Sequence, residues 1–399
     1  MHRPVGRHVL AELGGVAPAV LDDPALLERA LGTALTGAGA HVWQVLAERF
    51  APQGVTVVAV LAESHASVHT WPELGSAFVD VFTCGDNADP VAAVHALAAA
   101  LGAGSCAVEV VERGGPGRLD EPISAGLTRR WRLDAVRVRT RTALQEVLIA
   151  DTAQGVTLFC DGERQSAEHT QLTYHEALFV PGALLAERRE RVLVVGSSEG
   201  VVSELAVAAG AVRVDHVDLD AECVRLCAAH LPYGYTPETL AAAEQGAGAV
   251  RVHYADGRRF VRESREAWDV IVVDLPDERP GEPDDQLNAL YTEGFLADCA
   301  ARLRPGGVVV SQAGSPAVWR DATLRAAWAR FGAVFPGRVY VGSPEHEWAF
   351  LCGTTTPVPE PGRRAASRLA DLPYRPQTLD SEDLLAHLVP PSTLRLAGR

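Results

Sequence analysis

The 399-residue chain contains no lysine, and all 36 of its basic residues are arginine. Enzymes that use pyridoxal phosphate hold it as a Schiff base on a lysine, so this cofactor has no usual anchor here. Walker-type phosphate loops need a Gly-Lys-Ser/Thr run and are excluded for the same reason. Any chemistry on an amino acid's amine therefore requires another carbonyl, which a serine side chain can become.

Long apolar runs and a regular cysteine pattern are also lacking. No segment approaches the ~18 apolar residues of a membrane-spanning helix. Glu12 and the nearby glycines interrupt the apolar residues of 1–21, so we expect no signal peptide. Seven cysteines at irregular positions make no disulfide framework, and Cys223 and Cys227 lack a second ligand pair. These features predict a reduced, cytoplasmic chain without a metal site.

The balance of charge is acidic. The formal net charge is -15, with 47% hydrophobic and 22% charged residues. An acidic chain disfavours nucleic acid and anionic membranes and suits cationic small molecules. The length and composition predict a globular protein of two or three domains that acts on small-molecule substrates.

The first part of the chain has a recurring pattern. Asp22-Asp23-Pro24 and Asp89-Pro90 each begin an apolar helical segment that ends near glycine, as helix capping requires. Strand-like runs occupy 40–49, 55–61, 78–82 and 106–113. We therefore expect a small two-layer α/β sandwich over 1–116. The glycines and proline of 114–117 predict that a linker follows, over 117–135.

The rest of the chain changes its pattern twice. Short strands over 136–185 predict a small β subdomain. Over 186–356, strands alternate with helices, which predicts a doubly wound, Rossmann-like domain of the methyltransferase type. Residues 357–399 form a Pro/Arg-rich spacer and a C-terminal tail. The predicted fold class is α/β.

The segment Glu63–Glu73 carries a distinctive set of reactive side chains. The Ser64 hydroxyl can attack the preceding carbonyl and convert the peptide bond into an ester, whose elimination and hydrolysis leave a pyruvoyl group. Histidine is the usual agent of such proton transfers. The new ketone can form a Schiff base with an amino acid and draw electrons from its carboxylate, after which a thiol can return a proton. His69 and Cys84 suit these tasks, although the spacing alone also fits a strand-end turn and a core cysteine.

With Phe50–Val55 before it and Asp80–Gly85 after it, this segment resembles the prokaryotic S-adenosylmethionine decarboxylase proenzymes, over about 1–115. The resemblance implies cleavage between Glu63 and Ser64, a self-generated pyruvoyl group from Ser64, a processing role for His69 and proton donation by Cys84. It also implies a homodimer or higher oligomer with substrate at the interface. The chain departs from the family pattern, beside its substrate pocket, at Glu48, Val57, Leu74 and Ser76. Arginine or ornithine therefore stays an alternative substrate.

A second group of residues follows strands of the predicted Rossmann-like domain. Gly196–Gly200 comes between a strand and a helix, where adenosyl ligands bind. Asp218 ends the next strand, where a carboxylate can bind ribose hydroxyls. Asp256-Gly257 and Asp274–Asp277 follow the next two strands. Because ligands bind at the carboxyl ends of the strands in open α/β sheets, these residues predict a binding site.

Together with 161–165 and 174–178, these residues resemble the spermidine synthase (polyamine aminopropyltransferase) family, over about 136–380. That family transfers the aminopropyl group of decarboxylated S-adenosylmethionine to a diamine, putrescine giving spermidine. Removing a proton from an alkyl amine at pH 7 costs about 4–5 kcal/mol. The resemblance implies that Asp274 is the base, Tyr174 its helper, and Asp277 and Trp348 diamine ligands. It implies adenosyl or aminopropyl contacts for Gln145, Gln165, His175, Gly196, Glu199, Asp218, Asp256 and Gly257.

The two resemblances predict a bifunctional enzyme whose halves catalyse consecutive steps of polyamine biosynthesis. Ser197, Ser198 and Glu199 depart from the second family, which has two glycines and an aspartate at these positions. Glutamate keeps the charge but reaches one methylene further, so the identity of the diamine stays open. A non-catalytic, adenosyl-binding regulatory half and a methyltransferase are the other readings of this region.

Overall fold

The computed structural model describes residues 6–85, 87–114, 117–279 and 286–396. The chain divides into two compact units, Met1–Pro116 and Gly117–Arg399, each with hydrophobic clusters of its own. The predicted α/β fold class is confirmed. None of the described helices is both long and apolar enough to span a membrane.

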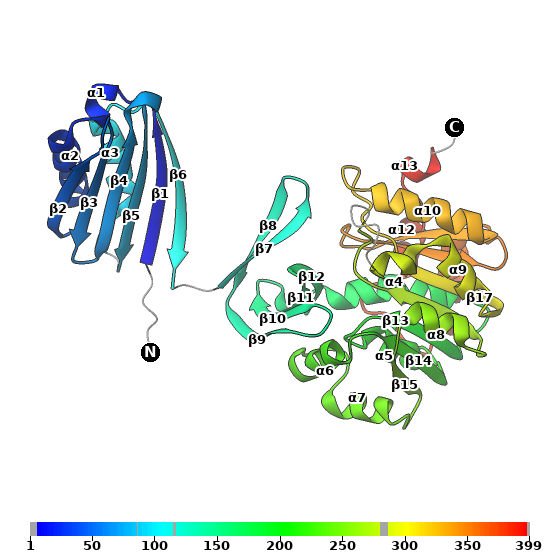
Figure 1. Cartoon of the computed structure of the whole chain (residues 1–399). Coiled ribbons are helices and arrows are strands. Elements are labelled where there is room, and N and C mark those ends of the chain that lie inside the picture. The colour runs from blue at the N-terminus through cyan, green and yellow to red at the C-terminus, as the bar shows by residue number, and fades with distance from the viewer. Residues whose placement is uncertain (1–5, 86, 115–116, 280–285, 397–399) are drawn as a thin grey trace. The chain divides into compact units, whose positions relative to one another are not determined.

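The first unit is a two-layer α/β sandwich (Figure 1). Its antiparallel sheet has the strand order β2-β3-β4-β5-β1-β6, and α2 and α3 pack against one face. The elements are β1 (Gly6–Gly14), α1 (Pro18–Leu21), α2 (Pro24–Gly37), β2 (Val42–Arg49), β3 (Val55–Leu61), β4 (Ser64–Trp71), η1 (Pro72–Leu74), β5 (Ser76–Cys84), α3 (Pro90–Ala100) and β6 (Ser105–Arg113).

The predicted helices and most strands of this unit are confirmed. The Asp23 carboxylate accepts a hydrogen bond from the Leu26 N–H (3.0 Å) at the start of α2, and Asp89 accepts one from Val91 (3.0 Å) at the start of α3. Proline follows each cap, where its missing N–H costs nothing. The four predicted strands correspond to β2, β3, β5 and β6.

Strands β1 and β4 lie outside the predicted set. In β4, Ala66, Val68 and Thr70 are buried under the helices, while His65 and His69 alternate with them on the other face. Because the buried face of β4 carries the small Ala66 and the polar Thr70 beside Val68, the apolar alternation that marks a strand is weak. Ser64, expected just beyond a strand, is therefore the first residue of β4.

The second unit begins with a β-hairpin, so the prediction of a linker over 117–135 is wrong. Strands β7 (Gly117–Ser124) and β8 (Leu127–Leu133) pair antiparallel, with Gly126 at a φ of 77° in the turn. The Trp131 ring is buried, and its Nε1 donates a hydrogen bond to Glu121 (2.7 Å). The turn-forming glycines that suggested a linker stop at Gly117, and the strands that follow are rich in charged residues.

A four-stranded sheet and a helix follow the hairpin. The sheet has the order β12-β11-β10-β9. Helix α4, expected within the β subdomain, instead packs its almost wholly buried length into the core of the Rossmann-like domain. The elements are β9 (Ala135–Arg141), β10 (Glu146–Thr152), β11 (Gly155–Cys160), β12 (Glu163–Ala167) and α4 (Gln171–Leu185).

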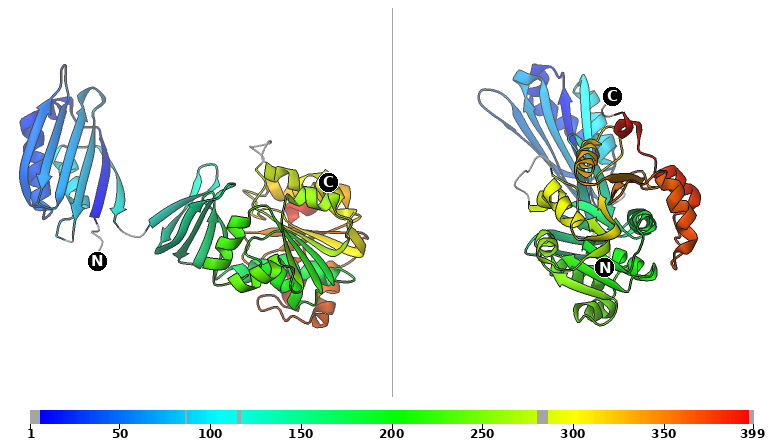
Figure 2. Two further views of the ribbon diagram at one scale, coloured as in Figure 1. Left: turned by 60° about the horizontal axis from the view of Figure 1, so that its bottom comes forward. Right: turned by 90° about the vertical axis from the view of Figure 1, so that its right-hand side faces the viewer.

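The predicted doubly wound domain is confirmed. In the order β15-β14-β13-β16-β17-β19-β18, the first five strands are parallel, β19 is antiparallel to β17, and β18 is antiparallel to β19. Helices cover both faces of the sheet (Figures 1 and 2). The elements are β13 (Arg191–Gly196), α5 (Val201–Ala208), β14 (Arg213–Asp218), α6 (Ala221–His230), α7 (Pro237–Glu244), β15 (Val250–Tyr254), α8 (Gly257–Glu263), β16 (Trp268–Asp274), η2 (Gln286–Tyr291), α9 (Glu293–Ala300), β17 (Leu303–Gln312), α10 (Ala322–Val334), β18 (Gly337–Gly342) and β19 (Ala349–Thr354).

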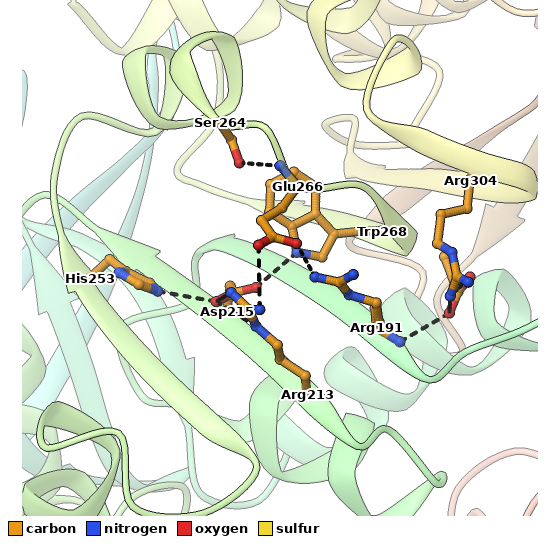
Figure 3. A network of polar contacts seen from close by, with 9 residues as sticks. Arg191, Arg213, Asp215, His253, Ser264, Glu266, Trp268 and Arg304 are labelled. Atoms are coloured by element: carbon orange, nitrogen blue, oxygen red, sulfur yellow. Dashed lines mark hydrogen bonds and ion pairs between the residues drawn. The ribbon is translucent and has the colours of Figure 1, made fainter.

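A buried polar network joins neighbouring strands of this sheet (Figure 3). The fully buried Asp215 of β14 accepts hydrogen bonds from Trp268 Nε1 of β16 (3.0 Å), from His253 Nε2 of β15 (3.2 Å) and from Arg213 (3.1 Å). A buried carboxylate is tolerated when it is fully hydrogen-bonded in this way.

The C-terminal segment, predicted as a spacer and tail, also contains helices. Helix α11 (Pro361–Arg368), η3 (Leu369–Asp371), α12 (Ser381–His387) and α13 (Ser392–Arg395) follow β19. Between them, Tyr374 and the backbone N–H groups of Gln377 and Thr378 donate hydrogen bonds to the fully buried Glu176 of α4. This segment therefore supplies hydrogen-bond donors to the buried Glu176 carboxylate, which follows Tyr174 and His175 in the sequence.

Candidate active sites

The carboxyl ends of the parallel strands in the second unit open onto a cavity of about 720 Å³. All twelve residues that sequence analysis placed in the transferase site line this one cavity. They are Gln145, Gln165, Tyr174, His175, Gly196, Glu199, Asp218, Asp256, Gly257, Asp274, Asp277 and Trp348. Three of them, Gly196, Asp218 and Asp274, are the last residues of β13, β14 and β16, so the parallel sheet itself brings them together.

Tyr174 and Asp274 make the closest polar pair in the middle of this set. Helix α4 presents the Tyr174 hydroxyl, which donates a hydrogen bond to Asp274 Oδ1 at 2.7 Å. Burial, with the neighbouring Asp274 charge, raises the pKa of Tyr174 well above its ordinary value. The phenol therefore stays protonated at neutral pH and fixes the orientation of a carboxylate that can accept a proton. His175 Nε2 lies 3.9 Å from the other oxygen of Asp274.

The end of the cavity near β13 and β14 has the geometry of an adenosyl site. Gly196 has a φ of 81°, and a side chain there would place Cβ 2.0 Å from the Asp274 carbonyl oxygen, so glycine is required. Ser198 Oγ donates a hydrogen bond to Asp218 (2.7 Å). Burial raises the pKa of Asp218 to about 7, because the hydrogen bonds that it accepts from the Asp220 N–H and Ser198 offset only part of the lost solvation.

One residue near this end, Asp220, was missed by sequence reasoning. Asp220 lines the cavity and accepts hydrogen bonds from Gln145 Nε2 (3.0 Å) and from the Thr142 hydroxyl (2.7 Å). It also caps helix α6. Its position two residues after Asp218 is the only sequence signal for it, and helix capping explains an aspartate there equally well.

Glu199 is also almost completely buried in the cavity wall. Burial is the main reason that its pKa is raised, His175 lowers this pKa, and Asp274 raises it further. A cationic group on a bound ligand would relieve the cost of ionising this carboxyl. The glutamate that replaces the family's aspartate therefore keeps the means to bind an amine.

The opposite end of the cavity has a dense set of charges. Gln312 Nε2 donates a hydrogen bond to Asp277, and the Arg320 guanidinium lies 3.6 Å from its second oxygen. The Tyr174 and Trp348 rings meet edge to face, with centroids 6.0 Å apart. The hairpin β7–β8 contributes Arg129, which forms an ion pair with Glu347. Because the hairpin was predicted to be a linker, sequence reasoning missed its share of the cavity wall.

In the first unit, Ser64 lies at the start of β4 with an imidazole beside it. Its hydroxyl is 3.1 Å from His65 Nδ1. In the sheet register Ser64 is paired with Thr83, and Cys84 is the next residue of β5. The preceding residue, Glu63, bonds through its carboxylate to His41 Nδ1 (2.6 Å), and this hydrogen bond holds the pKa of Glu63 below its ordinary value.

His69 lies elsewhere on the same strand. It is five residues beyond Ser64, which is roughly 16 Å along an extended chain. Its Nδ1 is hydrogen-bonded to the Thr56 hydroxyl of β3, and its ring contacts Trp71 (4.5 Å between centroids). Within one chain, the structure therefore brings His65 to Ser64, and it does not bring His69 there. Sequence reasoning named neither His65 nor Thr56 as a functional residue, although both are polar residues on strands beside the motif.

Among the described residues, no three or more His, Cys, Asp or Glu side chains form a group that could hold a metal ion.

Comparison with known proteins identifies the first unit. The family model described as S-adenosylmethionine decarboxylase matches residues 7–114. The S-adenosylmethionine decarboxylase proenzyme of Caldanaerobacter subterraneus is 46% identical over 110 residues, which are 28% of this chain and 89% of the relative. That of Prochlorococcus marinus is 47% identical over 115 residues, 29% of this chain and 92% of the relative. Through its first unit, the chain belongs to the S-adenosylmethionine decarboxylase family.

The second unit matches a different family. The model described as spermine/spermidine synthase domain covers residues 171–340. A solved spermidine synthase in complex with the transition-state analogue AdoDATO shares the fold, with a TM-score of 0.61, 18% identity and coverage of 70% of this chain and 95% of that one. The spermidine synthase of Thermotoga maritima gives a TM-score of 0.59 at 17% identity, covering 70% and 94%. The chain is thus a fusion of two domains of polyamine biosynthesis.

Proposed function

We propose that this chain makes and then uses an aminopropyl donor. The first unit cleaves itself before Ser64 and decarboxylates S-adenosylmethionine. The second transfers the aminopropyl group of the product to a diamine, putrescine giving spermidine. The observation that carries the first assignment is the 46% identity over nearly the whole length of a proenzyme relative. The second rests on the Tyr174–Asp274 pair in the centre of the large cavity.

In the self-cleavage step, the Ser64 hydroxyl attacks the Glu63 carbonyl carbon. His65 Nδ1, 3.1 Å from the hydroxyl, can accept the proton as the new C–O bond forms. The peptide C–N bond then breaks to leave an ester, and elimination releases the Glu63 carboxylate and leaves dehydroalanine at position 64. Hydrolysis of the dehydroalanine by water releases ammonia and leaves the pyruvoyl group. Once formed, the pyruvoyl group would supply a carbonyl that draws electrons from an amino acid's carboxylate. Cys84 is the proposed proton donor and His69 a proposed processing residue.

In the transfer step, the amine nitrogen attacks the methylene carbon next to the sulfonium of the donor. The C–S bond breaks with its electrons going to sulfur, which leaves a neutral thioether. Asp274 accepts the proton that the amine loses, and Tyr174 keeps the carboxylate aimed through its hydrogen bond. Asp218 and Asp256 are proposed to bind the adenosyl part, and Glu199 the donor's amine.

We also propose that the chain forms a homodimer through the first unit. The face of its sheet away from the helices exposes Leu10, Val58, Val60 and Phe78. Such apolar residues on a continuous face suit association with a second copy. The expectation of a cytoplasmic enzyme stays a prediction. Light scattering on purified protein measures the oligomeric state.

Self-cleavage is tested by mass and by substitution. Purified protein should yield a 63-residue fragment and a larger remainder on a denaturing gel, and Ser64→Ala should stay a single chain. Ser67→Ala, a serine of the same strand, should be cleaved normally and serves as the control. An uncut wild-type chain would contradict the proposal.

The two activities are tested by products. Incubation with S-adenosylmethionine should release carbon dioxide, whereas arginine and ornithine, the alternative substrates, should not. Addition of putrescine should then give spermidine and methylthioadenosine. If carbon dioxide is released but no aminopropylated amine forms with any diamine, the second unit is a non-catalytic, adenosyl-binding domain.

A further inference from the structure

Glu163 lies at the charged end of the cavity, near Asp277, and the proposed reaction gives its carboxylate no role. It begins β12, directly after the turn at Asp161 and Gly162, and its side chain lines the cavity while partly buried. Gln165, two residues later, lines the same cavity, as expected for alternate positions of a strand. Glu163 therefore shares a wall with a residue of the predicted site.

The other carboxylates at this end already have partners. Asp277 contacts Gln312 and Arg320, and Glu278 forms an ion pair with Arg330. Two further glutamates are held by the hairpin and β12. Glu347 forms ion pairs with Arg129 and Arg164, and Glu121 accepts hydrogen bonds from Trp131 Nε1 (2.7 Å) and the Arg164 N–H (3.0 Å).

Glu163 differs from all of these. Over the part of the chain that the structure describes, its carboxylate has neither a hydrogen bond nor an ion pair. Burial raises its pKa; the Arg279 guanidinium lowers it, whereas the carboxylates of Asp277, Glu121 and Asp161 raise it again. Three carboxylates and one guanidinium therefore act on the Glu163 carboxyl group. A carboxylate in such a place is stabilised when a cation binds to it.

The second cationic group of a diamine is the ligand that fits. The reacting nitrogen must lie at Asp274, and the rest of the amine extends toward the charged end of the cavity. To bind at Asp277, the far ammonium group would have to displace the Arg320 guanidinium, which lies 3.6 Å from that carboxylate. Binding at Glu163 breaks no hydrogen bond or ion pair among the residues that the structure describes, and it neutralises a carboxylate.

We propose that Glu163 binds the second ammonium group of the amine acceptor and makes the enzyme select amines that carry one. This inference rests on the proposed aminopropyl transfer. It assigns the specificity for diamines to β12, and it leaves Asp277 as a residue that is held by Gln312 and Arg320. The acceptor class is a diamine or longer polyamine, in preference to a monoamine of the same length.

The test compares putrescine with 1-butylamine, which has the same carbon chain without the second ammonium group. Binding of each amine to the full-length protein, in the presence of methylthioadenosine, is measured by calorimetry for wild type, Glu163→Gln and Asp277→Asn. We expect Glu163→Gln to weaken putrescine binding by about tenfold or more, the size of a charge-assisted hydrogen bond. Binding of 1-butylamine should not change.

Glu222→Gln is the matched control, because Glu222 is exposed on α6 and lies outside the cavity wall. It removes the same charge and should leave both affinities unchanged. Equal putrescine affinity in Glu163→Gln and wild type would overturn the inference, as would a loss confined to Asp277→Asn. Thermal unfolding of each variant shows whether it is folded.

Turnover is measured in parallel, so that the two proposals can fail separately. If wild type binds putrescine through Glu163 but forms no spermidine, the transferase assignment fails and the binding site stands. If spermidine forms and the ratio of kcat/KM for putrescine to that for 1-butylamine is the same in Glu163→Gln, the inference fails alone. A ratio that falls by about tenfold or more supports it.

Discussion

At the Tyr174–Asp274 pair, a hydroxyl that stays protonated is joined to a carboxylate. Its burial raises the cost of ionising the phenol, so Tyr174 donates a hydrogen bond and does not take a proton itself. Asp274 is then the proposed base, and Tyr174 fixes the orientation of its carboxylate through the hydrogen bond. This division of roles follows from burial and geometry together.

Tyr174→Phe should therefore lower kcat for aminopropyl transfer by about 10²-fold, at the lower end of the range for groups that assist proton transfer. Donor affinity should change little, because the ring and its contact with Trp348 remain. Tyr254→Phe removes a hydroxyl that contacts Glu244 outside the cavity and is the control. Steady-state kinetics with both substrates would show the effect; an unchanged kcat contradicts the assignment.

Asp218 predicts a pH effect of the opposite sign from an ordinary paired carboxylate. Its folded pKa is about 7, above the ordinary 3.8, so the folded state binds its proton more tightly than the unfolded state. The group therefore costs stability as the pH rises from about 4 to 7, and the full cost is present above pH 7.

Asp218→Asn should remove this cost. The variant should be more stable than wild type at pH 8, by up to about 4 kcal/mol, and the gain should shrink at pH 5. At the same time it should bind the adenosyl donor more weakly. Urea unfolding at the two pH values and calorimetric binding of methylthioadenosine measure both effects. A variant that is less stable at pH 8 would show that the carboxylate is not strained by burial.

The residues that the second resemblance named for a transferase site line one cavity, because the strand order brings the ends of separate sequence motifs to a common edge of the sheet. Asp218 and Asp274 end β14 and β16, the two parallel strands on either side of β13, so their place at one edge of the sheet follows from the fold class. The partners of Asp277 could not be predicted in this way. Arg320 and Gln312 reach it from segments whose side-chain directions depend on packing.

On the scale of elements, a similar limit explains why the sequence did not predict the β7–β8 hairpin and strand β4. Both have polar residues at positions that face the core, such as Glu121 in β7 and Thr70 in β4, so the contrast between inward and outward positions is weak. Arg129 becomes a cavity residue only because the hairpin folds over the four-stranded sheet, a contact that no local pattern records. The contact between Ser64 and His65 also depends on the local rotamers at the first residues of β4.

The strands of the doubly wound sheet are also joined by side chains. Asp215 accepts hydrogen bonds from β15 and β16 as well as from its own strand (Figure 3). Burial alone would raise its pKa, but the hydrogen bonds from His253, Trp268 and Arg213 outweigh it and lower the pKa to about 2. The stabilisation is complete above pH 4 and is lost as the pH falls toward 2.

Asp215→Asn should therefore lower the free energy of unfolding of the second unit by about 2–3 kcal/mol at pH 7. The difference from wild type should decrease as the pH falls from 4 to 2, because wild type loses the same interaction there. Urea unfolding monitored by tryptophan fluorescence measures it, since Trp268 lies in the network. A difference that is constant with pH would contradict the role of the ionised form.

On the scale of the whole molecule, two hydrophobic cores lie in one chain. The cluster of the first unit contains no residue beyond Val110, and the clusters of the second begin at Leu119. Each unit has the size of an independent domain. The family matches also follow this division, because residues 7–114 match one family model and residues 171–340 match another.

We therefore expect two separate unfolding transitions in calorimetry of the full-length protein. Methylthioadenosine should raise the midpoint of one transition only, because a ligand stabilises the unit that binds it. Ser64→Ala should leave that ligand-dependent transition unchanged. A single transition that shifts as a whole with ligand would show that the two cores unfold together.

The strand order of the first unit has a consequence for the cut chain. Strand β1, from the piece before Ser64, is inserted between β5 and β6 of the other piece and pairs with both along its whole length. Strand β3, which also precedes Ser64, pairs with β4, which begins at Ser64. Cleavage before Ser64 would therefore leave the two fragments associated, because strands of the shorter fragment lie between strands of the longer one. We expect them to separate only when the whole sheet unfolds.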